Sequence, residues 1–267
     1  MNAAMGGLPH AWRGVTGLNC DFNDLFSSVS ANYSDFRPTY PATIFAWLAR
    51  IAPGRGLAWD CGTGNGQAAI ALASHFTRVV ATDASRNQIE RALPHPRIEY
   101  RVASAECSGL AARSVDLITV AQALHWFDTE LFFAEARRVL AGRGVLAVWS
   151  YGALTVEGEE VDAEVQRFSH AVVGPFWPPE RALVEAGYRD ILLPFARLEA
   201  PDFTMAVRWS LDQLLGYLGT WSATSRYTEA MGHDPVGLLR PRLVEVWGEV
   251  ERRRKVVWPL VLLAGRR

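Results

Sequence analysis

One carboxylate and three glycines form the stretch of the chain that is most suggestive of chemistry. Asp60 ends a short apolar run, and Gly62, Gly64 and Gly66 follow at alternate positions. A run of strong helix formers begins directly afterwards, at Gln67. This order predicts a strand, a tight glycine turn and a helix whose free N–H groups point back over the turn. The turn is therefore expected to hold a small ligand at the end of a parallel strand.

Residues around the turn favour one of two kinds of nucleotide-like ligand. Gly64, Gly66 and Ala69 fit the dinucleotide fingerprint, and Asp83 stands at a suitable separation to meet a ribose hydroxyl. Asp60 argues against a dinucleotide, because its carboxylate would repel a pyrophosphate. The same carboxylate would favour a ligand with an ammonium and a sulfonium group, and S-adenosylmethionine carries both together with a ribose. An NAD(P)-dependent oxidoreductase stays open as the alternative.

The stretch resembles the Asp-x-Gly-x-Gly-x-Gly motif of the class I S-adenosylmethionine-dependent methyltransferases. Further segments, in order, extend the resemblance over most of the chain towards the small-molecule branch that includes trans-aconitate methyltransferase. These segments are Arg37-Pro38-Thr39-Tyr40-Pro41, Ser104-Ala105-Glu106, Ala121-Gln122-Ala123-Leu124-His125-Trp126-Phe127, Arg137-Arg138-Val139-Leu140 and Thr220-Trp221-Ser222-Ala223. The resemblance implies a Rossmann-like fold and methyl transfer from S-adenosylmethionine to a small molecule.

The resemblance also implies roles in cofactor binding. Asp83 would accept the ribose hydroxyls in charge-assisted hydrogen bonds. Ala105 and Glu106 would lie beside the adenine, where this chain has Ser104 at a position that is aspartate in many relatives. The residues implied at the methionine end are Asp60, Gly62, Gly64, Gly66, Gln122 and Ala123.

Aromatic residues around Arg37 indicate an acceptor site. Residues 21–41 place this arginine among aromatic side chains, just before two prolines that stiffen the chain. We interpret the segment as a lid over the glycine turn with Tyr33, Arg37 and Tyr40 facing the ligand; an ordinary surface loop is the alternative. The other residues expected to shape the pocket, each of which could instead pack the core, are His125, Trp126, Trp149, Tyr151 and Trp221.

His125 is the candidate catalytic base. A base is not required if the acceptor is a carboxylate, because that group is already ionised at neutral pH. The enzyme then mainly aligns the acceptor with the methyl group, and Arg37 would pair with the carboxylate. Transfer to the oxygen of a carboxylate or a hydroxyl is therefore favoured.

Apolar runs and helical patterns alternate along the chain. Strands are expected at residues 57–60, 78–82, 97–102, 115–121, 145–149, 189–198 and 256–263. Helices are expected at residues 42–51, 67–73, 85–93, 130–140, 157–173, 180–186, 209–217 and 235–253. The repeated strand–helix units predict an α/β fold with a Rossmann-like, doubly wound, mostly parallel sheet and helical cap additions.

The same patterns predict four segments. Residues 1–41 form an N-terminal leader and lid, and residues 42–200 form a Rossmann-like cofactor-binding core. Residues 201–255 form a helical cap insertion, and residues 256–267 form a final strand that returns to the core sheet.

Composition limits the partners. The 267 residues carry a net charge of −1, which gives no broad attraction to nucleic acid or to an anionic membrane. Three cysteines stand far apart without metal-ligand spacing, so we expect no metal and a reducing cytoplasm. No apolar run approaches the ~20 residues of a membrane span. A small-molecule acceptor and a monomer or homodimer are expected.

The sequence therefore predicts a cytoplasmic S-adenosylmethionine-dependent methyltransferase that acts on a small molecule. Two alternatives of other kinds are an NAD(P)-dependent oxidoreductase and a non-catalytic S-adenosylmethionine-binding protein. The oxidoreductase lacks support from a visible proton-donor pair such as Tyr-x-x-x-Lys. The binding protein stays open because methyl transfer needs no visible catalytic residue.

Overall fold

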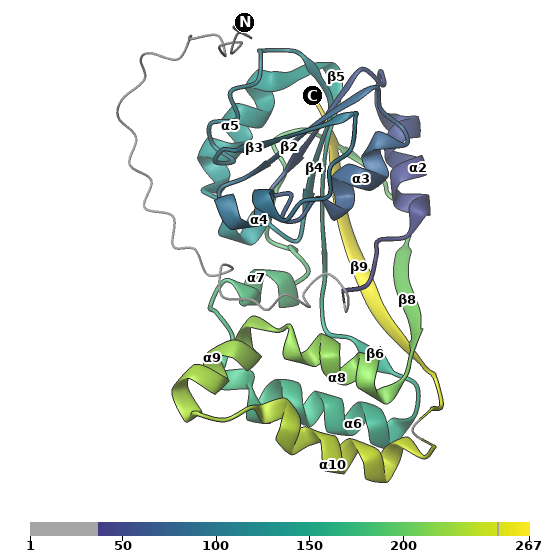
Figure 1. The fold of residues 1–267 in the computed structure, drawn as a ribbon. Coiled ribbons are helices and arrows are strands. Elements are labelled where there is room, and N and C mark those ends of the chain that lie inside the picture. Colours follow the sequence, from purple (N-terminus) through teal and green to yellow (C-terminus); the bar gives the residue numbers. More distant parts are fainter. Residues whose placement is uncertain (1–36, 250) are drawn as a thin grey trace, which may run out of the picture.

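The alternating apolar runs form one mixed sheet of nine strands in the computed structural model, which describes residues 37–249 and 251–267 (Figure 1). Its main order is β3-β2-β1-β4-β5-β9-β6, and β7 and β8 also pair with β9. Strands β1 to β5 are parallel to their neighbours, whereas β9 runs antiparallel to β5. The strands are β1 Leu57–Cys61, β2 Arg78–Asp83, β3 Ile98–Val102, β4 Val115–Ala121, β5 Leu140–Tyr151, β6 Thr155–Val156, β7 Ala196–Leu198, β8 Phe203–Trp209 and β9 Arg254–Arg266. The predicted Rossmann-like, mostly parallel sheet is confirmed.

Helices lie on both faces of the sheet and in a separate group beyond one end of it (Figure 1). The α-helices are α2 Ala42–Ile51, α3 Gln67–Ala73, α4 Arg86–Glu90, α5 Thr129–Val139, α6 Glu159–Arg167, α7 Arg181–Glu185, α8 Leu211–Gly219, α9 Ser222–Met231 and α10 Pro235–Trp247. Three short turns of other helix types are η1 Leu124–Trp126, η2 Phe168–Val172 and η3 Gly174–Phe176.

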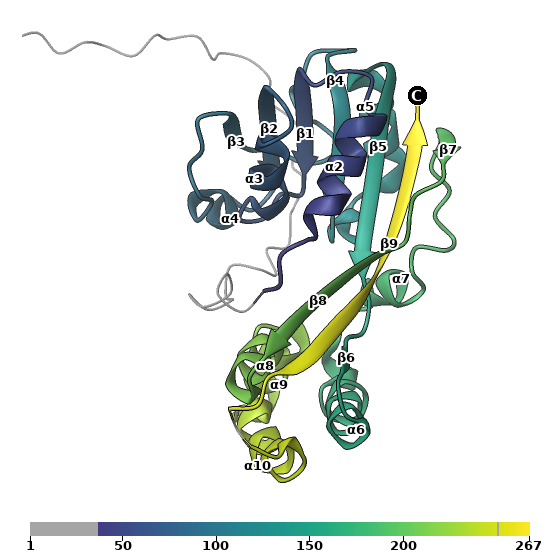
Figure 2. The same ribbon diagram turned by 90° about the vertical axis from the view of Figure 1, so that its right-hand side faces the viewer.

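The side-chain alternation of the central strands creates two apolar layers. In β5, Val145, Ala147 and Trp149 point to the layer that holds α2 and α3, whereas Leu146 and Val148 point to the layer that holds α5. Figure 2 shows α2 in front of the parallel strands and α5 behind them. Both faces of these strands are therefore buried, as their nearly continuous apolar sequence predicts.

The cap group consists of α6, α8, α9 and α10, which lie beyond the carboxyl end of β5 (Figure 1). Its core is rich in aromatic side chains, among them Trp209, Tyr217, Trp247 and Trp258. Arg242 of α10 pairs with Glu164 of α6, and that contact holds the pKa of Glu164 down to about 2. The long strands β8 and β9 extend from the parallel sheet to the cap group (Figure 2). They therefore link the cap group to the parallel sheet and its two apolar layers.

Two expected elements differ most from the structure, and the helix expected at 235–253 also ends earlier, at Trp247. The strand expected at 189–198 is limited to β7, because turns at 188–191 and Pro194 prevent regular pairing before Ala196. Residues 203–209, which carried no strand expectation, form β8 with buried residues at alternate positions. Trp209 therefore ends a strand instead of beginning a helix. Helix α8 begins after Ser210, whose side chain and that of Gln213 form a capping box.

Pro259 lies inside β9, opposite Thr204 of β8 in a continuous register. It is neither at the strand start nor at a bulge, two of the positions to which proline is usually confined in a sheet. On the other side of β9, the residues paired with β6 end at Val257 and those paired with β5 begin at Leu260. The missing N–H of the proline is tolerated at this gap between two partner strands.

Two further findings bear on the expected partners. Among the helices of residues 37–249 and 251–267, none is long and apolar enough to cross a bilayer. Within the same residues, no group of three or more His, Cys, Asp or Glu side chains is placed to hold a metal ion. The four-segment division of the chain stays a prediction.

Candidate functional site

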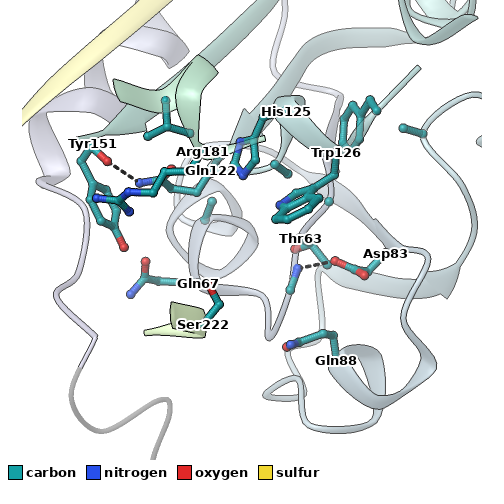
Figure 3. A pocket seen from close by; sticks show the side chains of 18 of the residues that line it. Thr63, Gln67, Asp83, Gln88, Gln122, His125, Trp126, Tyr151, Arg181 and Ser222 are labelled. Atoms are coloured by element: carbon teal, nitrogen blue, oxygen red, sulfur yellow. Dashed lines mark hydrogen bonds between the residues drawn. The ribbon is translucent and has the colours of Figure 1, made fainter. Parts of the chain in front are cut away.

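A cavity of about 1320 Å³ opens where the parallel strands end, between the sheet and the cap group. Residues at or after the ends of β1 to β5 line it, together with residues of α6, α7, α8 and α9. Figure 3 shows some of these side chains, among them Asp83, Gln122, Arg181 and Ser222. The strand order reverses between β1 and β4, which is where ligands bind in sheets of this kind. Single small ligands occupy pockets of roughly 300–1,000 Å³, so this cavity has room for a cofactor and a second small molecule.

The glycine turn after β1 needs its glycines for two different reasons. Gly62, Gly64 and Gly66 have φ values of 67°, 56° and 90°, a backbone region that strains other residues. Gly62 and Gly64 line the cavity. Gly66 does not line it; a Cβ there would lie 2.4 Å from the hydroxyl of Tyr100 on β3. Gly66 therefore permits the start of helix α3 to pack close to Tyr100 of β3.

Gly66→Ala should lower the free energy of unfolding by about 2 kcal/mol or more, because left-handed strain and overpacking add. Gly219→Ala is the matched control, since Gly219 lies in α8 with nothing within 4 Å of a Cβ at that position. Urea denaturation of both variants measures the effect. A Gly66→Ala protein as stable as Gly219→Ala would contradict the packing explanation.

Asp60 lies beneath the turn and does not line the cavity. Its carboxylate accepts hydrogen bonds from the hydroxyls of Thr63, at 2.5 Å, and Thr119 of β4, at 2.6 Å. Burial raises its pKa to about 6, and the two threonine bonds offset part of that rise. The described geometry therefore gives Asp60 a role in fixing the turn to β4, and direct contact with a ligand ammonium stays a prediction.

The raised pKa makes stability depend on pH. Between the unfolded and folded pKa values of Asp60, the folded protein holds a proton that the unfolded chain has released. Raising the pH from about 5 to about 7.5 should therefore cost the wild type roughly 1–2 kcal/mol of unfolding free energy relative to Asp60→Asn. Urea titrations of both proteins at the two pH values measure this difference. A difference that does not change with pH would contradict the assigned shift.

Asp83, the last residue of β2, lines the cavity beside the glycine turn (Figure 3). Its carboxylate accepts the backbone N–H of Gly64 at 2.8 Å and that of Ser85 at 2.9 Å. These bonds fix the side chain in position, and carboxylate oxygens can accept further hydrogen bonds. Asp83 is thus held where it can meet hydroxyls of a ligand.

The far end of the cavity is lined by the segment after β3. Ser104, Ala105 and Glu106 all line it, and contact of Ala105 and Glu106 with an adenine stays a prediction. Glu106 accepts the backbone N–H of Asp128 at 3.2 Å. The exposed apolar side chain of Leu131, on α5, lines the same end and could cover one side of a ring.

At the end of β4, Gln122 and Ala123 line the cavity next to the glycine turn. Gln122 has a φ of 56°, which is unusual for this residue type. Its side-chain amide donates to the carbonyl of Tyr151 at 3.0 Å, which stabilises this strained turn. Strain of this kind concentrates at functional sites.

Arg37 spans the sheet and the cap group from the N-terminal segment. Its guanidinium donates to the hydroxyl of Tyr151 at 3.0 Å and to the carbonyl of Thr220 at 3.2 Å, and it lies over the ring of Tyr217. Tyr40 of the same segment packs against Tyr151. Arg37, Tyr40 and Tyr151 all line the cavity, so the structure brings these predicted acceptor residues together.

His125 and Trp126 lie side by side in η1 and line the cavity (Figure 3). The Nδ1 of His125 is 2.9 Å from the hydroxyl of Tyr188. Burial, together with the positive charge of Arg181, lowers the pKa of His125 to about 4. The imidazole is therefore neutral at neutral pH and is a weak base.

The remaining predicted residues fall in different places. Trp221 lines the cavity and packs against Trp177. Trp149 does not line it; this side chain is fully buried and supports Tyr40 through an edge-to-face contact. Tyr33 lies outside the residues that the structure describes.

Several residues that line the cavity belong to no motif in the sequence. Arg181, at the start of α7, stacks its guanidinium over the ring of Trp177 at 3.6 Å and pairs with Glu185. No motif marks it, because it reaches the cavity only through the fold of residues 174–181. Other lining residues with polar side chains include Thr63, Asn65, Gln67, Gln88, Asp128, Glu135, Gln166, Ser169 and Ser222.

Comparison with known proteins gives three findings. A family model described as a methyltransferase domain matches residues 59–148. A protein of Dictyostelium discoideum named as a methyltransferase is 33% identical over 88% of this chain and 91% of its own length. A Saccharomyces cerevisiae protein named as an S-adenosylmethionine-dependent methyltransferase is 27% identical over 46% of this chain and 45% of its own length.

A solved structure supports the same relationship. It is named as a type II methyltransferase from Anaeromyxobacter dehalogenans and is 48% identical to this chain. The alignment covers 86% of this chain and 97% of that one, with a TM-score of 0.80. The sheet and the cap group are therefore shared with a protein of known structure.

Proposed function

Because the chain belongs to the class I S-adenosylmethionine-dependent methyltransferases, we propose that it methylates a carboxylate oxygen of a small molecule. S-adenosylmethionine supplies an electrophilic methyl group when it is bound.

The cavity residues fit the cofactor. Asp83 presents a fixed carboxylate for ribose hydroxyls, and the backbone of Gly62 and Gly64 allows close approach. Ala105 and Glu106 would border the adenine, and Gln122 and Ala123 would border the methionine end. These assignments leave the part of the cavity under the cap group for the acceptor.

We call that part the acceptor chamber and define it by its lining residues. They are Arg37, Pro38, Tyr40, His125, Tyr151, Gly152, Ala153, Leu154, Val165, Gln166, Ser169, Trp177, Pro178, Arg181, Val184, Tyr217, Thr220, Trp221 and Ser222. Among the described residues, this set contains two arginines and no aspartate or glutamate, although Arg181 is paired with Glu185 outside the set. This charge distribution is the observation that carries the proposal, because it favours an anionic acceptor and disfavours an amine.

The low basicity of His125 supports the same class of acceptor. A hydroxyl acceptor would need a base, and His125, with a pKa near 4, is a weak one at neutral pH. A carboxylate is already ionised and gives up no proton on methylation. Arg37 would hold it, and the buried aromatic walls would exclude water while the oxygen is aligned with the methyl group.

The resemblance to the trans-aconitate branch is consistent with this acceptor class. It stays a prediction, since none of the relatives reported above carries that name. The identity of the acid is likewise not part of the proposal.

A screen with matched acceptors tests the proposal. Carboxylic acids would be offered together with the primary amide, alcohol and amine of the same carbon skeleton, and formation of S-adenosylhomocysteine would be followed. We expect turnover with some acids and none with their matched partners. Preferred methylation of an alcohol or amine would contradict the acceptor class, and absence of turnover with every compound would favour a non-catalytic binding protein.

A further inference from the structure

A buried tyrosine from a distant part of the chain holds His125 from behind the acceptor chamber. Tyr188 is 1% exposed and does not line the cavity, yet its hydroxyl lies 2.9 Å from the Nδ1 of His125. The other ring nitrogen, Nε2, is on the side of the imidazole away from this contact. The hydrogen between these two residues belongs either to the Tyr188 hydroxyl or to Nδ1 of His125.

The backbone around Tyr188 is unusual. Gly187 and Tyr188 both have positive φ values, of 61° and 52°, and the N–H of Tyr188 bonds to the carbonyl of Leu183 at the end of α7. A bulky residue rarely adopts this conformation, and it persists where the surrounding structure enforces it. The turn places the Tyr188 ring in the core beside His125 and nowhere near solvent.

The protons around the phenol can be counted. Burial raises the pKa of Tyr188, so the phenol keeps its proton at neutral pH. Nδ1 of His125 is the one hydrogen-bond partner of the Tyr188 hydroxyl among the described residues. The buried Ser150 hydroxyl makes no hydrogen bond to it.

These facts give the contact a direction. If Nδ1 carried the proton, the buried proton of the Tyr188 hydroxyl would have no acceptor among the described residues. If Tyr188 donates to Nδ1, that proton has a partner. A neutral imidazole whose Nδ1 accepts must carry its proton on Nε2.

We propose that Tyr188 is a positioning residue that fixes His125 with Nε2–H towards the acceptor chamber, where it donates a hydrogen bond to the acceptor carboxylate. This inference rests on the proposed function, and it replaces the role of a base with that of a donor. An ionised carboxylate offers no proton to a base but accepts hydrogen bonds well. Nε2–H and the guanidinium of Arg37 would then hold the acceptor together.

The charged group that faces His125 from the neighbouring element is Arg181 of α7. Its positive charge opposes protonation of the imidazole, so the ring stays neutral and keeps a single N–H. Glu185 pairs with Arg181 and offsets part of this charge. Trp126 packs against the other part of the ring and carries no charge.

Nuclear magnetic resonance of the full chain with isotope-labelled histidine tests the proposal without knowledge of the acceptor. The protein would be saturated with S-adenosylhomocysteine, and the His125 signals would be assigned by their loss in His125→Gln. We expect an unprotonated Nδ1 and a protonated Nε2 at neutral pH. A protonated Nδ1 would overturn the proposal.

A matched pair of variants isolates the contribution of Tyr188. Tyr188→Phe should move the Nδ1 signal of His125 towards that of a nitrogen without a hydrogen bond. Tyr227→Phe is the control, because the Tyr227 hydroxyl lies 3.1 Å from Nε2 of His233 and should affect that histidine alone. An unchanged His125 signal in folded Tyr188→Phe would contradict the assignment, and if that variant does not fold, the wild-type spectrum still decides.

The role of Nε2–H as a donor has its own kinetic test. Glutamine can present an N–H in place of Nε2–H, whereas alanine cannot. We expect His125→Gln to retain at least about 10-fold more kcat/KM than His125→Ala, which corresponds to one hydrogen bond to a charged group. Equal loss in both variants would overturn the donor role.

The two proposals fail in different experiments. If acids are methylated but Nδ1 is protonated, the proposed function stands and this inference fails. If the tautomer is as expected but only alcohols or amines are methylated, the proposed function fails and the carboxylate partner of Nε2–H fails with it, while the contact from Tyr188 stands.

Discussion

Replacing Arg37 with alanine is expected to lower kcat/KM for a carboxylate acceptor by roughly 1000-fold, because a desolvated charge partner of the acceptor is lost. Affinity for S-adenosylhomocysteine should stay within a few-fold of the wild type. Arg37 lies in the acceptor chamber on Tyr151 and Thr220, apart from the glycine turn and Asp83. Steady-state kinetics and calorimetric titration measure the two quantities separately.

Tyr151→Phe is the control for this variant. It removes the hydroxyl that accepts from Arg37 but keeps the positive charge in the chamber. We expect a loss of about 10-fold or less, the size of one hydrogen bond. If Arg37→Ala were as active as Tyr151→Phe, the charge of Arg37 would not bind the acceptor.

Replacing Asp83 with alanine is expected to weaken S-adenosylhomocysteine binding by roughly 1000-fold, because two charge-assisted hydrogen bonds to the ribose are lost. The substitution also removes the acceptor for the N–H of Gly64, which loosens the glycine turn. Turnover at saturating cofactor should change much less than affinity. Calorimetric titration measures the loss directly.

Asp116 provides a matched control at the other end of β1. Its carboxylate also accepts two backbone N–H groups, those of Gly56 at 2.8 Å and Leu57 at 3.2 Å, but it does not line the cavity. Asp116→Ala should therefore lower stability and leave affinity unchanged. Unchanged affinity in folded Asp83→Ala would refute the ribose assignment.

The parallel core could be predicted from sequence because each strand is marked locally. The apolar run at Val115–Ala121 coincides with β4, and the alternating run near residue 98 gives β3 at the edge of the sheet. Periodicity was less informative for β8, since only Ser210 separates Phe203–Trp209 from the apolar start of α8 at Leu211. Only the capping box at Ser210 marks that boundary.

The family was predicted correctly, although Asp60 does not face the cavity as the argument against a pyrophosphate assumed. Its carboxylate is turned beneath the glycines by Thr63 and Thr119. A sequence shows that a carboxylate is adjacent to a turn but not which way it points. The same limit applies to Trp149, which the alternation along β5 directs into the core.

Contacts between segments that are far apart along the chain could not be predicted from the sequence. Arg181 reaches the acceptor chamber from 55 residues after Trp126 only because α7 folds back over the sheet ends. Tyr188 meets His125 across 63 residues for the same reason. Neither residue belongs to a motif, and their partners are defined by tertiary packing.

The most direct test of the central claim is the chemistry of the product. The enzyme would be incubated with an accepted acid and with S-adenosylmethionine labelled in the methyl group, and the purified product would be treated with mild alkali. A methyl ester releases its label as methanol, and this release is the result that we predict. Label that stays with the product through alkali would mean transfer to a hydroxyl, nitrogen or carbon, and would contradict carboxylate methylation.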